Sequence, residues 1–103
     1  MLCAFWLVIA YAQCGRLDDA RSLMDRLVAL RNDVGLLGEE IDTATGHHWG
    51  NFPQAFSHLG LVLAATEIAN AESASAATAS AVDAGTETVG AAVGTAEGVA
   101  AQR

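Results

Sequence analysis

The chain has 103 residues, which is enough for at most one domain. Twelve acidic residues against five arginines and no lysine give a formal net charge of −7. This balance argues against binding to nucleic acid or to an anionic membrane surface, because no basic patch could neutralise phosphates. Apolar residues make up 52% of the chain, a share that is typical of a folded core.

The first predicted element is a helix from Leu2 to Gln13, which Gly15 ends. It carries no charged residue and is apolar on every side, as in a helix that is buried all round. Cys3 and Cys14 are too far apart on it to pair and are expected to be buried thiols. The helix is too short to span a bilayer and lacks the basic start of a signal peptide, so a cytoplasmic protein is predicted.

The second predicted helix starts after Arg16 and runs to about Leu30. Asp18 and Asp19 suit its first turn, where acidic side chains interact favourably with the helix dipole. Its apolar residues recur at the spacing of an amphipathic helix. We therefore expect one face of this helix to be in contact with water.

A long connection, residues 32–52, precedes a third, mostly apolar helix from about Gln54 to Ala69. Pro53 suits the start of that helix. Connections longer than about 12–15 residues in a compact unit are usually functional or disordered. This one has its own apolar residues, among them Leu37, Ile41 and Trp49, which favours an ordered, functional loop.

The composition changes near Asn70. Residues 71–103 hold twelve alanines and four glycines, and no aromatic residue, leucine or isoleucine. Such a segment has nothing to pack. The sequence thus predicts an all-α fold in residues 1–70, with three helices, followed by an Ala/Gly-rich flexible tail in residues 71–103.

The polar residues of the connection could in principle form a metal site or take part in acid/base catalysis. His47, His48 and His58 do not have the spacing of a metal site, so no metal and no cofactor are expected. Glu39 and Glu40 cannot form an acid/base pair with each other, because adjacent side chains diverge. Either of them could still be half of a pair whose other carboxylate comes from elsewhere, since loops between buried helices often present such residues.

Residues 3–65 resemble the C-terminal end of the catalytic domain of glycoside hydrolase family 15, which contains glucoamylases, glucodextranases and bacterial trehalases. The resemblance rests on four stretches taken together: Cys3-Ala4-Phe5-Trp6-Leu7, Gly15-Arg16-Leu17-Asp18-Asp19-Ala20, Glu39-Glu40-Ile41-Asp42 with Gly46, and Gly50-Asn51-Phe52-Pro53-Gln54-Ala55-Phe56-Ser57-His58. Residues 71–103 share nothing with the family. Two positions depart from its pattern: Gly38 stands where Ser or Ala is usual, and Thr43 where Pro is frequent.

The resemblance implies an (α/α)6 barrel of paired helices and hydrolysis of α-glucosidic bonds with inversion. It places the general base on Glu39, and residues that line or support the site on Asn51, Gln54 and Phe56. The implied ligand is an α-glucoside or a trehalose-type carbohydrate. The family's general acid would precede this segment, so the chain alone is expected to be inactive and to need the N-terminal portion of the barrel as its partner.

A second interpretation stays open from the sequence. The chain could be a non-catalytic helical interaction module or an inactive remnant. We expect the apolar faces of the first and third helices to be partly bare, because two further helices cannot surround the first. The interaction module predicts that Glu39→Gln changes nothing measurable, whereas the hydrolase fragment predicts loss of any complemented activity.

Overall fold

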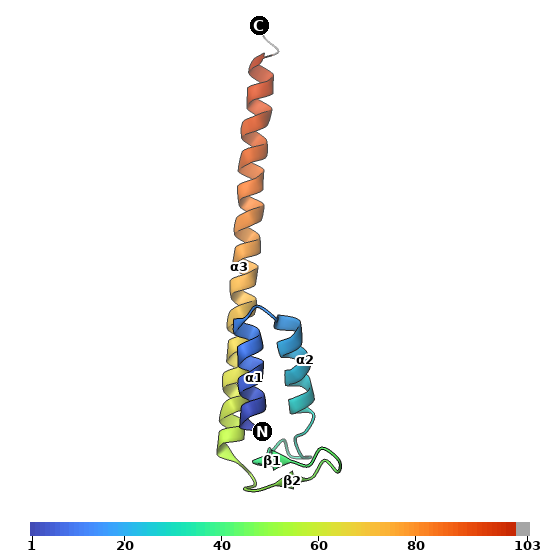
Figure 1. Ribbon diagram of the computed structural model, residues 1–103. Helices are drawn as coiled ribbons and strands as arrows, with labels where there is room; N and C mark the ends of the chain where they lie inside the picture. The colour runs from blue at the N-terminus through green and yellow to red at the C-terminus, as the bar shows by residue number, and fades with distance from the viewer. Residues whose placement is uncertain (101–103) are drawn as a thin grey trace. The chain divides into compact units, whose positions relative to one another are not determined.

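The computed structural model describes the backbone of residues 1–100 and the side chains of residues 1–84. Within these residues there are three helices, α1 (Leu2–Gln13), α2 (Leu17–Val28) and α3 (Ala55–Ala100) (Figure 1). The prediction of an all-α fold is confirmed. Between α2 and α3 the chain also forms two short antiparallel strands, β1 (Glu40–Ile41) and β2 (His48–Trp49), which the sequence did not predict.

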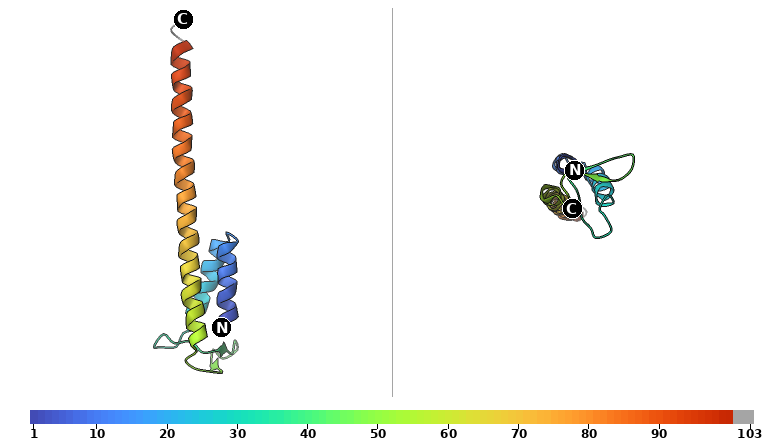
Figure 2. Two further views of the ribbon diagram at one scale, coloured as in Figure 1. Left: turned by 90° about the vertical axis from the view of Figure 1, so that its left-hand side faces the viewer. Right: turned by 90° about the horizontal axis from the view of Figure 1, so that it is seen from below.

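The chain consists of two compact units, Met1–Glu72 and Ser73–Arg103. In the first unit, α1, α2 and the first turns of α3 lie side by side, and the strand pair lies at the end where α1 and α3 begin (Figures 1 and 2). Gly15 has φ +75°, a conformation that glycine adopts without strain, and this residue allows the chain to reverse between α1 and α2. The guanidinium carbon of Arg16 then lies 4.5 Å from the centroid of the Tyr11 ring.

The core forms where the three helices of the first unit meet. Its buried members are Phe5, Val8 and Ala12 of α1, Ala20 and Leu27 of α2, Ala64 of α3, and Leu37 of the connection. Gly60 allows α3 to approach α1 closely, since an added Cβ would lie 3.0 Å from Leu2 Cδ1 and 3.2 Å from Phe5 Cβ. The connection is thus anchored in the core through Leu37, two residues before Glu39.

One flank of α1 and one of α3 are bare, as predicted. The exposed large apolar residues here are Trp6 and Leu7 of α1 and Phe56, Leu59, Val62 and Leu63 of α3. Cys3 and Cys14 are exposed as well, so the expectation of buried thiols was wrong. The reason is the same in each case: no element of the first unit packs against these sides of the helices.

Two helix ends differ from the sequence prediction. α2 ends at Val28 rather than near Leu30, and α3 continues past Ala69 to Ala100, through a segment rich in alanine, the best helix former. α3 begins at Ala55, one residue after the predicted start at Gln54, and Pro53 lies before it. That residues 71–103 act as a flexible tail stays a prediction. In the part of the chain that the structure describes, no helix is long and apolar enough to cross a membrane.

Candidate active site

Glu39 lies directly before β1, and its side chain is exposed. Its carboxylate Oε2 accepts a hydrogen bond from the backbone N–H of Asn51 at 3.0 Å. In return the Glu39 N–H donates to the Asn51 carbonyl, also at 3.0 Å, and the ammonium of Met1 donates to the Glu39 carbonyl at 2.8 Å. The carboxylate is therefore held in place while it remains open to solvent.

The strand register explains what faces Glu39. Glu40 pairs with Trp49 and Ile41 with His48, so Gly50 comes opposite Glu39. A Cβ at Gly50 would lie 2.7 Å from Glu39 Oε2 and 3.0 Å from Glu39 Cβ. Gly50 also has φ +74°, where a side chain would be strained. The absence of a side chain at Gly50 thus leaves the space that the Glu39 carboxylate occupies.

The two residues before Glu39 are buried, and each backbone polar group there has a partner. The Leu37 N–H donates to His58 Nε2 at 3.2 Å, and the Leu37 carbonyl accepts from the Gln54 N–H at 2.9 Å. The Gly38 N–H donates to His48 Nδ1 at 3.1 Å, and the Gly38 carbonyl accepts from the Ser57 hydroxyl at 2.8 Å. Buried backbone groups are nearly always paired in this way.

These contacts change the interpretation of the histidines. His48 is partly buried, packs on Phe52 with ring centroids 5.2 Å apart, and accepts a hydrogen bond, so it has a structural role in the connection. His58 accepts at Nε2, so its proton lies on Nδ1, which faces the Gln54 carbonyl at 2.8 Å. Among the residues with described side chains, no group of three His, Cys, Asp or Glu residues could hold a metal ion.

Of the other residues implied by the resemblance, only Asn51 contacts Glu39. Asn51 contacts Glu39 through its backbone, whereas Gln54 contacts Leu37 and His58, again through its backbone. Phe56 is 64% exposed on the bare side of α3. Glu40 lines a shallow hollow with Ile41, Asp42 and Trp49. Glu39 and Glu40 therefore have different surroundings, as adjacent side chains of a strand do.

Sequence reasoning missed four residues that build this site, namely Gly50, His48, Ser57 and His58. Their roles depend on which backbone groups they meet across the fold, and spacing along the chain carries no information about that. One feature of the sequence could have pointed to these roles. If Leu37 and Gly38 are buried, their two backbone N–H groups need hydrogen-bond acceptors.

The turn that joins the strands is ordered by Asp42. Its carboxylate accepts from the Ala44 N–H at 2.9 Å and from the Thr45 hydroxyl at 2.8 Å, and Gly46 completes the turn with φ +75°. The Ala44 N–H, followed by the Thr45 hydroxyl, holds the pKa of Asp42 below its ordinary value, because both donors favour the ionised form. The ionised carboxylate therefore stabilises the turn at neutral pH, and this stabilisation is lost as the pH falls through the lowered pKa.

We expect Thr45→Val to raise the pKa of Asp42 toward its ordinary value, because the substitution removes the hydroxyl donor and keeps the branched shape. The measurement is an NMR titration of the Asp42 carboxyl carbon in the full chain. Thr43→Val is the matched control, since Thr43 is an exposed neighbour in the same turn. An equal titration of Asp42 in the wild type and in Thr45→Val would contradict this assignment.

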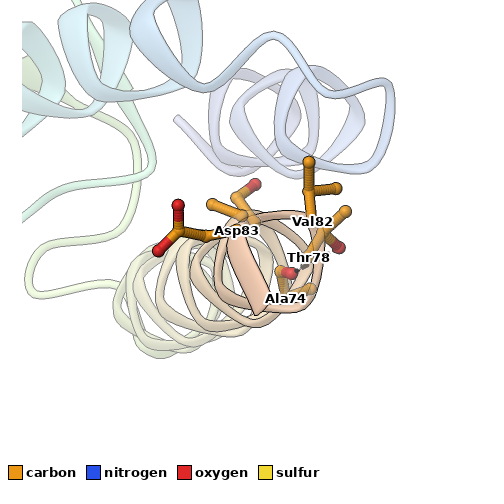
Figure 3. A pocket seen from close by; sticks show the side chains of 6 residues that line it. Ala74, Thr78, Val82 and Asp83 are labelled. Carbon is orange, nitrogen blue, oxygen red and sulfur yellow. Dashed lines mark hydrogen bonds between the residues drawn. The ribbon is translucent and has the colours of Figure 1, made fainter. Parts of the chain in front are cut away.

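A further hollow belongs to the second unit. It is lined by Ala74, Ser75, Thr78, Ala79, Val82 and Asp83, all from one stretch of α3 (Figure 3). One face of a single helix cannot enclose a small molecule on several sides, as ligand sites usually do. This hollow therefore adds nothing to the candidate site around Glu39.

Comparison with known proteins gives a consistent result. The sequence model of glycosyl hydrolases family 15 matches residues 15–66. The trehalase of Mycolicibacterium smegmatis is 44% identical to this chain over 71 residues, which are 69% of the chain and 11% of that protein. For the trehalase of Mycobacterium tuberculosis the identity is 42% over 71 residues, 69% of the chain and 10% of that protein.

An archaeal relative is similar over the same share of the chain. The trehalase of Thermoplasma acidophilum is 38% identical over 71 residues, which are 69% of this chain and 12% of that protein. The chain thus spans about a tenth of the length of the curated relatives that it matches. No solved structure matches the chain significantly.

Proposed function

Because the chain belongs to glycosyl hydrolases family 15, we propose that it is a segment of an inverting glycosidase and that Glu39 is its general base. This role is supported by the fact that the Glu39 carboxylate is both hydrogen-bonded and exposed. Oε2 is fixed by the Asn51 N–H at 3.0 Å, yet the side chain is exposed to solvent. A general base needs both properties, since it must be positioned and must reach a water molecule.

In the proposed reaction, Glu39 takes a proton from a water molecule on the face of the sugar opposite the leaving group. The water oxygen bonds to the anomeric carbon as the glycosidic bond breaks, and a second carboxyl group protonates the leaving oxygen. In inverting enzymes the two carboxyl groups are about 6.5–9.5 Å apart, which leaves room for the water. Glu40 does not suit the second role, because adjacent side chains diverge and Glu40 lines a hollow with Asp42 and Trp49.

We assign the general acid to the part of the family domain that this chain does not match. The matched relatives are about ten times as long as the matching segment, so most of such a domain lies outside it. One protonating group is typically worth about 10²–10⁴-fold in rate. The chain alone is therefore expected to hydrolyse glycosides poorly or not at all.

The proposed substrate is trehalose or another α-glucoside. The three relatives compared above all carry the name trehalase, which favours trehalose over the glucoamylase-type substrates of the same family. Asn51, Gln54 and Phe56 are proposed to line or support the sugar site. For Phe56 this fits a large apolar ring that is 64% exposed in the chain by itself.

The bare flanks of α1 and α3 support the proposed partner. Trp6 is 55% exposed and Val62 is 57% exposed, and large exposed apolar residues gathered on one flank of a helix often mark a contact region. We propose that the rest of an (α/α)6 barrel covers these flanks. The same surface also suits the alternative function, a helical interaction module without catalysis.

A complementation assay tests the proposal. The full chain is combined with the M. smegmatis relative from which the matching 71 residues have been removed, and trehalose hydrolysis is followed by NMR. We expect activity only in the mixture, with β-glucose and α-glucose released together, because inversion acts on one of the two α-linked residues. Binding of the two pieces without any hydrolysis would favour the interaction module instead.

A further inference from the structure

The two residues before Glu39, Leu37 and Gly38, make most of their backbone hydrogen bonds to side chains. Leu37 is 0% exposed and Gly38 is also buried, yet both lie before β1. Three of their four backbone polar groups are paired by side chains, those of His58, His48 and Ser57, rather than by another backbone. The position of this segment therefore depends on three particular side chains.

We propose that His58, Ser57 and His48 are positioning residues for Glu39, and we call these three residues the backbone cradle. The inference rests on the proposed role of Glu39 as the base. The cradle fixes the residue immediately before Glu39, whose Cα is only about 3.8 Å from that of Glu39. It acts through the backbone and needs no contact with the substrate.

The cradle couples Glu39 to α3. Ser57 and His58 are in the first turn of this helix, and Ser57 is 1% exposed, so its hydroxyl has little freedom. Gly60, one turn further on, packs against Phe5 of the core. The backbone cradle thus connects the backbone before Glu39 to α3 and, through α3, to the core. The Asn51 N–H holds the Glu39 carboxylate itself.

The hydrogen bonds of His58 argue against other roles for this residue. Nε2 accepts from the Leu37 N–H, and Nδ1 faces the Gln54 carbonyl. In this geometry neither ring nitrogen has a free lone pair for a metal ion or a proton acceptor role. The same holds for His48 Nδ1, which the Gly38 N–H occupies. Positioning is the function that remains for these ring atoms.

The first test compares His58→Leu, His58→Gln and His47→Leu in the complementation assay, each with kcat and KM measured separately. His58→Leu removes the acceptor for the Leu37 N–H, and we expect kcat to fall about 10-fold to 100-fold with KM changed less than about threefold, since misplacement by about 1 Å can cost 10²-fold. His58→Gln is expected to recover most of kcat, because its amide oxygen can accept the same bond. His47→Leu, at an exposed histidine whose described hydrogen bonds run through its backbone, should behave as wild type.

The second test needs no activity. In the full chain, the NMR signal of the Asn51 amide reports its hydrogen bond to Glu39 Oε2. We expect it to shift in His58→Leu and to return in His58→Gln. If His58→Leu does not fold, as judged by circular dichroism, Ser57→Ala replaces it, since it removes only the hydroxyl that donates to the Gly38 carbonyl.

The two arms separate the possible failures. An unchanged kcat and an unchanged Asn51 signal in the folded His58→Leu or Ser57→Ala variant would overturn the positioning role. Absent activity in all complemented samples would count against the proposed function, and the Asn51 signal would then still decide whether the cradle holds Glu39. A lowered kcat that His58→Gln does not recover would also contradict the cradle, because the acceptor is restored in that variant.

Discussion

Replacing Glu39 by Gln is expected to lower trehalose hydrolysis by the complemented chain about 10²–10⁴-fold, the usual worth of one general base. Glutamine keeps the size of the side chain and an oxygen that can still accept from the Asn51 N–H. It cannot take a proton from water at neutral pH. The loss should therefore appear in kcat, with KM nearly unchanged, since the substitution removes an interaction of the transition state alone.

Glu40→Gln is the matched control for this substitution. Glu40 is the adjacent carboxylate, is also exposed and lies in β1, but it lines the hollow with Asp42 and Trp49. We expect its kcat to stay within about threefold of wild type. If both variants retained full activity, Glu39 would not be the base, and the interaction module would become the better account of the chain.

The second large effect is expected from Gly50→Ala. The new Cβ would lie 2.7 Å from Glu39 Oε2, a distance that real Cβ contacts essentially never show. The carboxylate would have to move and would lose its hydrogen bond to the Asn51 N–H. Since displacement of a reacting group by about 1 Å can cost about 10²-fold, we expect a loss of that order in kcat.

Gly46→Ala separates this contact from backbone strain. Gly46 has φ +75°, almost the same as the +74° of Gly50, but an added Cβ at Gly46 would meet no atom within 4 Å. Backbone strain should therefore cost both variants a similar free energy of unfolding, about 1–2 kcal/mol for a left-handed conformation with a side chain. Only Gly50→Ala should lose activity, and an equal loss in both would show that strain alone is responsible.

The helical part of the fold could be predicted from local patterns. The apolar stretch before Gly15 and the amphipathic stripe after Arg16 gave α1 and α2 to within about two residues. The bare flanks could be predicted too, because an uncharged helix such as α1 needs more neighbours than this chain supplies. The end of α3 could not, since an alanine-rich segment has high helix propensity whether or not it packs.

The candidate site was predictable only in part. Glu39 was singled out through a family resemblance, and its exposed, fixed carboxylate is compatible with that role. The strand pair was missed because each strand has only two residues, too few for an alternating pattern. The cradle was missed because His58 lies 21 residues from its partner Leu37, and a histidine that serves a backbone N–H looks in sequence like any other.

The strand pair also has a consequence for how the chain could be extended. The Asp42 N–H donates to the His47 carbonyl at 2.9 Å and closes the turn, and the β1–β2 pair separates that turn from Glu39. Extra residues inserted between Thr43 and Gly46 would lengthen an exposed tip and disturb the Asp42 contacts to Ala44 and Thr45. Beyond that loss, doubling a loop costs only about 0.6 kcal/mol. New side chains could therefore be added at this tip while the Glu39 carboxylate keeps its position.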